Sequence, residues 1–250
     1  MPLRVGLVYA QMKLGWAYKR LDELKIAVSK FRNDAYTVTQ HDNLEESLHY
    51  VWVEQKSTPD DVAMLPREFV YSLRSGLDQL AWQLALLTTD SPNGQTCFAI
   101  ESECPLASNK SYARKIANIP PPAVKIIESL QPYTGWSRRK EHPLWQLNRL
   151  SNIDKHEQVV VGSIPFRFES NVVMTARPHF KHGTLISIPL AEKGKFQLKI
   201  EVPDIPFGQP IDATDAIPDF EITTDGLSKI YKFVRYEVMP KFEPFFPNCR

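Results

Sequence analysis

The stretch LPREFVYSLRSGLDQLAWQLALL, which runs from Leu65 to Leu87, decides the fold because it is the longest uninterrupted periodic run in the chain. Its leucines and valines recur at steps of three and four residues, as on the buried face of an α-helix. Beside that apolar stripe lies a second stripe, made of Tyr71, Arg74, Asp78, Trp82 and Ala85. A helix with two such stripes is expected to pack on more than one side, so the sequence predicts a helical bundle.

Three other segments also have helical periodicity, and with residues 65–88 they form the predicted helical frame. They are residues 8–33, 142–157 and 226–243. Good helix formers dominate the first of them, and no proline interrupts it. In the last of them, Pro240 is expected to end or kink the helix, because proline lacks the backbone N–H that the helix needs.

Two segments, residues 36–56 and 158–224, have strand character. In the first, Tyr36–Gln40 and Ser47–Glu54 flank a predicted turn at His41–Asn43, which suits a β-hairpin. In the second, Val159–Val161 is a strand signal, and proline, glycine and aspartate separate four further candidate strands. These four are Val172–Ala176, Thr184–Pro189, Phe196–Val202 and Phe220–Thr223.

The proline-rich middle of the chain predicts only short elements. A strand is expected at Cys97–Ile100, and short helices near Ser108–Ala117 and Pro121–Leu130. Long helices thus bracket two β segments. The sequence therefore predicts an α+β protein, residues 1–250 as a single elaborated domain in which a helical bundle carries β insertions.

Composition excludes several classes of protein. The chain has 250 residues, 43% of them hydrophobic and 24% charged, which is ordinary globular usage. A net charge of +1 excludes a strongly basic coat for nucleic acid. Three cysteines are too few for a disulfide framework and suit a reducing compartment, so we expect a cytoplasmic protein. We expect no membrane association, because no apolar run approaches the roughly 18–20 residues of a span and the start lacks a signal-peptide pattern.

Known cofactor and metal motifs are also missing from the sequence. It contains no glycine-rich phosphate loop, no Gly-x-Ser-x-Gly elbow, no Cys-x-x-Cys and no His-Glu-x-x-His. The pair His179 and His182 has no evident third ligand nearby. We therefore expect neither a cofactor nor a metal.

The segment HPLWQLNRLSNIDKH, residues 142–156, is where chemistry is expected. At about 100° per residue, His156 lies about 20° from Arg149, and Asn152 lies within about 60° of it. Leucines occupy the opposite side. The forked arginine fits phosphate oxygens, and histidine can move protons near neutral pH. This trio could bind a phosphodiester and transfer a proton at it without a metal, although an arginine and a histidine on a helix are often only solvated or structural.

Asp154 falls on the leucine face, where an unpaired carboxylate would be costly to bury. We expect it to pair with Arg74 or Lys155, or else to orient His156. Arg74 and Asp78 are four residues apart and can form an ion pair on their own helix. Alternatively, Asp78 faces residues 142–157 and supports the site there.

Arg138, Arg139 and Lys140 form a basic run directly before this helix, with Tyr133 and Trp136 nearby. Basic residues interleaved with aromatic ones suit single-stranded RNA, because cations contact phosphates and rings stack on bases. The alternative is an ordinary solvated loop.

Two segments carry a resemblance to known proteins: SLRSGLDQLAWQLAL and HPLWQLNRLSNIDKH. Together they resemble a group of uncharacterised bacterial proteins with an Asn-Ile-Asp-Lys-His helix. More distantly, an arginine followed after six residues by a histidine, here Arg149 and His156, resembles the HEPN superfamily. Many HEPN proteins are metal-independent endoribonucleases of toxin–antitoxin, CRISPR and phage-defence systems, and they commonly act as dimers.

The HEPN resemblance implies a role for each residue of the motif. Arg149 would hold the scissile phosphate, and His156 would assist attack by the RNA 2′-hydroxyl or protonate the leaving oxygen. Asn152 and Asp154 would be supporting residues. A homodimer and an antitoxin or defence-system partner protein are implied as well. The competing hypothesis is a non-catalytic interaction or sensor module in which the same arginine, histidine and aspartate residues are structural.

Overall fold

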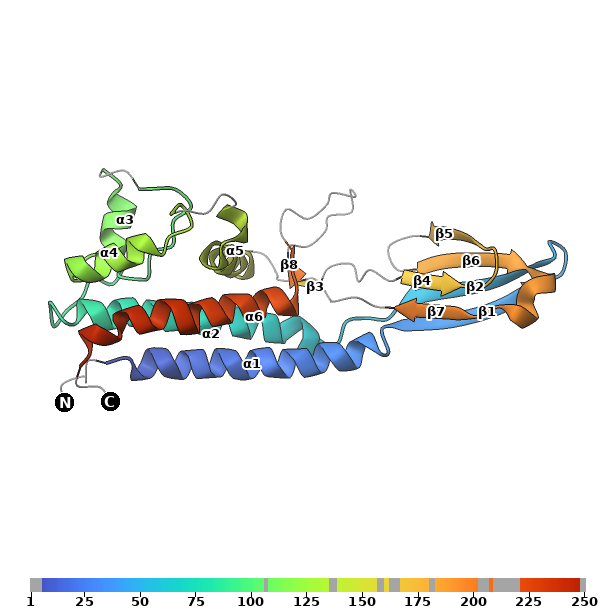
Figure 1. Ribbon diagram of the computed structural model, residues 1–250, viewed down its shortest axis with the longest axis horizontal. Coiled ribbons are helices and arrows are strands. Elements are labelled where there is room, and N and C mark those ends of the chain that lie inside the picture. Colours follow the sequence, from blue (N-terminus) through green and yellow to red (C-terminus); the bar gives the residue numbers. More distant parts are fainter. Residues whose placement is uncertain are drawn as a thin grey trace.

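The computed structural model describes residues 6–105, 108–134, 139–156, 160–161, 167–179, 183–201, 207–208 and 221–247. The molecule is elongated, with the long helices at one end and a β-sheet at the other (Figure 1). The model is a mixed α+β structure, as predicted. Each half has its own hydrophobic core.

Two long helices, α1 (Val8–Arg32) and α2 (Asp60–Ala85), form the base of the helical half. They run side by side along the length of that half (Figure 1). They approach closely at Gly76, where an added Cβ would lie 2.6 Å from Leu14 Cδ1 and 3.4 Å from the carbonyl oxygen of Ala10. Glycine at this position therefore permits the close packing of α1 on α2.

The helix α2 is longer at its start than its periodicity indicates. It begins at Asp60 rather than near residue 65, and it includes Pro66 in its interior. The two aspartates of its first turn, Asp60 and Asp61, favour this earlier start because they complement the positive end of the helix dipole. It ends at Ala85, three residues before the predicted end at residue 88.

Two further helices pack on this pair. The helix α5 (Pro143–His156) contacts α2 and α6 (Thr224–Lys232), and α6 in turn contacts α1. In Figure 1, α1, α2 and α6 lie lengthwise whereas α5 is seen end-on, so α5 crosses the other three. The bundle is therefore not a set of four parallel or antiparallel rods.

The chain after α6 keeps a helical path, but its winding changes. A π-helix (Phe233–Val238) follows α6 directly, and a 3₁₀ helix (Met239–Phe245) follows that. Pro240 lies in the first turn of the 3₁₀ helix, where its missing N–H costs no hydrogen bond. The predicted break at Pro240 is thus preceded by a change of winding at Phe233.

Short elements fill the middle of the chain. The helices α3 (Lys110–Lys115) and α4 (Pro121–Ser129) lie where short helices are predicted. The single turn η1 (Arg139–Glu141) precedes α5. Residues Cys97–Ile100 are not a strand, which corrects the prediction for them.

The two β segments share one sheet, a feature that the sequence does not predict. The sheet has the strand order β1-β2-β6-β5, and all its neighbours are antiparallel. Its strands are β1 (Tyr36–Asn43), β2 (Leu48–Gln55), β5 (Thr175–His179) and β6 (Gly183–Pro189). Because β2 pairs with β6, residues far apart in sequence are joined by backbone hydrogen bonds.

Smaller ladders and one 3₁₀ helix account for the other described elements of this region. The strand β8 pairs with both β3 and β9, β4 pairs with β7, and η2 follows β6. Their bounds are β3 (Val160–Val161), β4 (Arg167–Ser170), η2 (Leu190–Lys195), β7 (Leu198–Glu201), β8 (Phe207–Gly208) and β9 (Glu221–Ile222). The strand predicted at Val172–Ala176 begins later, at Thr175.

The hairpin between β1 and β2 is confirmed, but its turn is at residues 44–47 rather than at His41–Asn43. The cause is a cross-strand contact that keeps Asp42 in the ladder, where its Oδ1 lies 2.6 Å from Nδ1 of His49. Lys193 also bonds to Asp42, and the hydrogen bonds from Lys193 and His49 lower the pKa of the Asp42 carboxyl. These contacts were not visible as local sequence signals.

The helical half has a large core and the sheet a small one. The first includes many leucines of α1, α2 and α5 together with other apolar residues of the helical half, while Val51, Val53 and Ile186 form the second. Tyr36 packs against both. The α+β class is confirmed, and the prediction of a single domain stays a prediction.

The close approach at Gly76 leads to a test with an internal control. Gly15 lies in α1 with nothing within 4 Å of an added Cβ. Gly15→Ala is expected to stabilise the protein by about 0.5–1 kcal/mol, because alanine loses less conformational entropy in a helix. Gly76→Ala gains the same propensity but displaces Leu14 from the α1–α2 contact, so we expect net destabilisation of about 1 kcal/mol or more. Urea denaturation measures both, and equal stabilisation by the two substitutions would contradict the packing described here.

Candidate functional site

The helix α5 begins at a buried histidine. His142 is 2% exposed, and its Nδ1 accepts a hydrogen bond from the backbone N–H of Leu144 at 3.1 Å. Its ring meets the ring of Phe233 edge-on, with 5.2 Å between centroids. Burial lowers the pKa of His142 to about 4. At neutral pH this residue is therefore uncharged and serves as a cap that fixes where α5 starts.

The predicted leucine face of α5 is buried: Leu144, Leu147 and Leu150 are at most 1% exposed. Ile153, which lies about 40° from Arg149 around the helix, is equally buried, so the buried side reaches closer to Arg149 than the three leucines alone indicate. These residues hold α5 on α2 and α6, and so they determine which side of α5 remains accessible.

The accessible side of α5 carries Arg149 and Asn152. Arg149 is half-buried and Asn152 is exposed. Neither side chain makes a hydrogen bond or an ion pair with any residue that the structure describes. The helix continues without a break to His156, so the backbone positions 149 and 156 lie two turns apart on one face. The side chain of His156 lies outside the described part of the chain.

Asp154 forms an ion pair, as expected for a carboxylate on the buried leucine face. Its Oδ1 accepts a hydrogen bond from Nε of Arg67 on α2 at 2.6 Å. The partner is thus Arg67 rather than Arg74 or Lys155. This pair fastens α5 to α2, which gives Asp154 a structural task.

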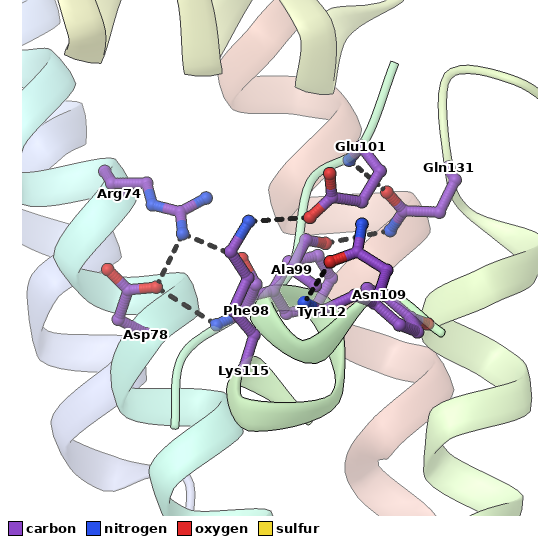
Figure 2. Close-up of polar contacts among 9 residues, drawn as sticks. All are labelled: Arg74, Asp78, Phe98, Ala99, Glu101, Asn109, Tyr112, Lys115 and Gln131. Carbon is purple, nitrogen blue, oxygen red and sulfur yellow. Dashed lines mark hydrogen bonds and ion pairs between the residues drawn. The ribbon is translucent and has the colours of Figure 1, made fainter. Parts of the chain in front are cut away.

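Arg74 and Asp78 of α2 also form a structural pair, which Figure 2 shows together with its neighbours. Nη2 of Arg74 lies 2.9 Å from Oδ1 of Asp78 and donates to the carbonyl oxygen of Phe98 at 2.7 Å. The same Asp78 oxygen accepts from the backbone N–H of Phe98 at 3.1 Å. We call this arrangement the Phe98 clasp. It satisfies both backbone groups of a buried residue that belongs to no strand.

Asp78 does not join the Arg149 face through any described contact. Its carboxylate is occupied by Arg74 and Phe98, and within the described residues it makes no hydrogen bond or ion pair with Arg149 or Lys155. Asp78 and Arg74, which were expected to support the site on α5, instead hold Phe98 in the clasp.

Sequence reasoning missed Gln131, a fully buried residue after α4. Its Nε2 donates to the carbonyl oxygen of Ala99 at 2.9 Å, and its Oε1 accepts from the N–H of Glu101 at 2.7 Å (Figure 2). Glu101 also pairs with Lys115 of α3 at 2.6 Å. Side chains thus replace a neighbouring strand for residues 98–101, and no local pattern in the sequence signals this.

Cys97, beside the Phe98 clasp, is not an activated thiol. Burial raises its pKa first, and the negative charge of Asp78 raises it further. The positive charges of Arg74, Lys115 and Lys155 oppose that shift.

The predicted basic run is partly visible. Arg139 and Lys140 are exposed on η1, whereas Arg138 lies outside the described residues. Arg139 donates to the carbonyl oxygen of Ser102 at 3.3 Å and lies 3.8 Å from Glu103. Lys140 precedes Arg149 by nine residues in the sequence.

Comparison with known proteins adds no family: no protein-family model, curated protein or solved structure matches the chain. Across the described ranges, no group of three or more histidine, cysteine, aspartate or glutamate residues is placed to hold a metal ion. In the same part of the chain, no helix has both the length and the apolar character that crossing a bilayer requires.

The Phe98 clasp is expected to be needed for stability. Asp78→Ala leaves the Arg74 guanidinium and the Phe98 N–H without their shared acceptor, so unfolding should become easier by about 1–3 kcal/mol. Glu103→Ala, at an exposed position, is the matched control and should change stability by less than about 0.5 kcal/mol. Thermal and urea unfolding measure both. An Asp78→Ala protein as stable as the control would contradict the clasp.

The buried cap predicts a pH dependence of stability. The native pKa of His142, about 4, lies below the usual histidine value of 6.5 because the ring is buried. Stability from neutral His142 is therefore complete above pH 6.5 and falls as the pH drops towards 4, by about 3 kcal/mol in total. His142→Asn keeps a capping acceptor but does not titrate. Urea unfolding between pH 7 and 4 should show a shallower acid slope for this variant, and parallel slopes would contradict the assignment.

Proposed function

We propose that this protein is a HEPN-like, metal-independent endoribonuclease that uses Arg149 and His156. The observation that carries the proposal is the free guanidinium of Arg149. Arg67 and Arg74 each hold a carboxylate, whereas Arg149 holds none among the described residues. A guanidinium that no carboxylate occupies is available to a phosphate, for which its fork of donors is well suited.

The chemistry needs two functions on one helix face. Arg149 would hold the non-bridging oxygens of the scissile phosphate and stabilise the charge that develops there. His156 would take the proton of the 2′-hydroxyl as its oxygen attacks phosphorus, or would give a proton to the 5′-oxygen as the P–O5′ bond breaks. Asn152, exposed between them, adds a neutral donor.

Binding of RNA beyond the scissile phosphate would use the start of α5. Arg139 and Lys140 are exposed there and would contact neighbouring phosphates, with Arg138 adjoining them in sequence. A homodimer, an antitoxin or defence partner, and a bacterial cytoplasmic setting follow from the HEPN resemblance alone and form part of the same proposal.

A non-catalytic interaction or sensor module is the second candidate, and one observation favours it. Asp154, Arg74 and Asp78, all expected to support a site, are occupied in contacts that hold α5 and Phe98 on α2. In this second candidate, Arg149 and His156 also serve to hold the fold together, and no polar residue of the bundle takes part in catalysis.

Cleavage of a labelled single-stranded RNA in the presence of EDTA tests the proposal. The wild type should cut, and Arg149→Ala and His156→Ala should each lose about 100-fold or more in rate, as the loss of a charge-stabilising donor and of a general acid or base does, respectively. Lys125→Ala, an exposed residue of α4, is the control and should cut like the wild type. Circular dichroism checks that each variant is folded. No cutting by the wild type, or equal cutting by a folded His156→Ala protein, would contradict the proposal.

A further inference from the structure

A cavity of about 510 Å³ opens between the beginning of α1 and the end of α2. Its walls are mainly apolar and aromatic: Tyr9, Met12 and Trp16 come from α1, and Trp82 and Leu86 from α2. Its volume lies within the range of roughly 300–1,000 Å³ that is usual for small-molecule sites. The Arg149 face contributes no residue to this cavity.

The side chains of this cavity are unusually accessible for their type. Tyr9 and Met12 are each 55% exposed and Trp16 is 51% exposed. On the other side of the same helix, Ala10, Leu14 and Ala17 are buried against the core. Large apolar side chains that gather around a concavity on a protein surface commonly mark a binding site.

One charged group, Lys13, lines the cavity, and it has no carboxylate partner among the described residues. Its Nζ lies 5.6 Å from the centroid of the Tyr71 ring, a cation–π contact that does not neutralise its charge. No aspartate or glutamate lines the cavity. Lys13 is therefore the only charged residue among the described residues that line the cavity.

The neighbouring cations of α1 differ from Lys13 because they are neutralised. Arg20 pairs with Glu23 at 2.8 Å and with Glu68 at 3.3 Å, and Lys19 lies 3.9 Å from Glu23. Among these three consecutive cations of α1, only Lys13, which lines the cavity, has no carboxylate partner in the described residues. An apolar ligand with a single negative charge would complement both the walls and Lys13.

We propose that this cavity binds a small aromatic carboxylate. Its ring would lie against the indoles of Trp16 and Trp82, where offset or edge contacts between aromatic groups are favourable. Its carboxylate would accept hydrogen bonds from the ammonium of Lys13. The described residues of the lining belong to α1 and to the end of α2, and the proposal is independent of the proposed ribonuclease activity.

Isothermal calorimetry with 2-naphthoate and its neutral analogue 2-naphthalenemethanol, on the full-length protein, tests the proposal. The wild type should bind the carboxylate about tenfold more tightly than the alcohol, which corresponds to one charge-assisted contact. Lys13→Met keeps the apolar stem of the side chain and should remove this preference. Lys125→Met, a lysine that does not line the cavity, is the matched control and should keep it.

A second variant distinguishes the contribution of the aromatic walls to binding from that of the Lys13 charge. Trp16→Ala, at a half-exposed position that leaves the core intact, should weaken both compounds about tenfold or more. Three results would overturn the proposal: no saturable binding of 2-naphthoate, equal affinity of the wild type for acid and alcohol, or an unchanged preference in Lys13→Met. A dimer of the wild type that Trp16→Ala dissociates would also overturn it, because a second copy would then cover the cavity.

Discussion

The packing of α2 on several sides is the constraint on which the rest of the structure depends. Gly76 lets α1 approach closely, Arg67 ties α5 through Asp154, and the Arg74–Asp78 pair holds Phe98. Burying a polar group without a partner is costly, and most polar groups on this side of α2 are paired. Arg74 and Asp78 of the second stripe bind each other and both backbone groups of Phe98, although Nη1 of Arg74 is buried without a hydrogen-bond partner among the described residues.

The candidate site differs from the rest of the bundle in the pairing of its polar side chains. Three of the polar residues expected to support chemistry, Arg74, Asp78 and Asp154, have structural partners. Arg149 and Asn152 lie on the accessible side of α5 without partners in the described residues. The proposed phosphate site rests on that contrast, since a guanidinium already held by a carboxylate is a poor ligand for a second anion.

The sequence predicts local features well and distant contacts poorly. Helical periodicity located α1, α2 and α5, and the leucine face of α5 was expected correctly. Pairing between β2 and β6 was not predicted, because strand signals do not specify which strands meet. The partner of Asp154 was missed for the same reason: Arg67 is 87 residues away in sequence. Helical geometry alone predicts that positions 149 and 156 share one face of α5. The structural role of Asp78, in contrast, becomes clear only from its hydrogen bond with the backbone N–H of Phe98.

The most direct test of the central claim is to ask which guanidinium groups meet RNA. Proton–nitrogen NMR of the arginine Nε–H groups, assigned by single Arg→Lys substitutions, can follow a titration with a 2′-O-methyl RNA that cannot be cleaved. The account predicts that the Arg149 resonance moves with saturation, while those of Arg67 and Arg74 stay in place because carboxylates hold them. An Arg149 resonance that does not move, while RNA binding is observed by another signal, would contradict it.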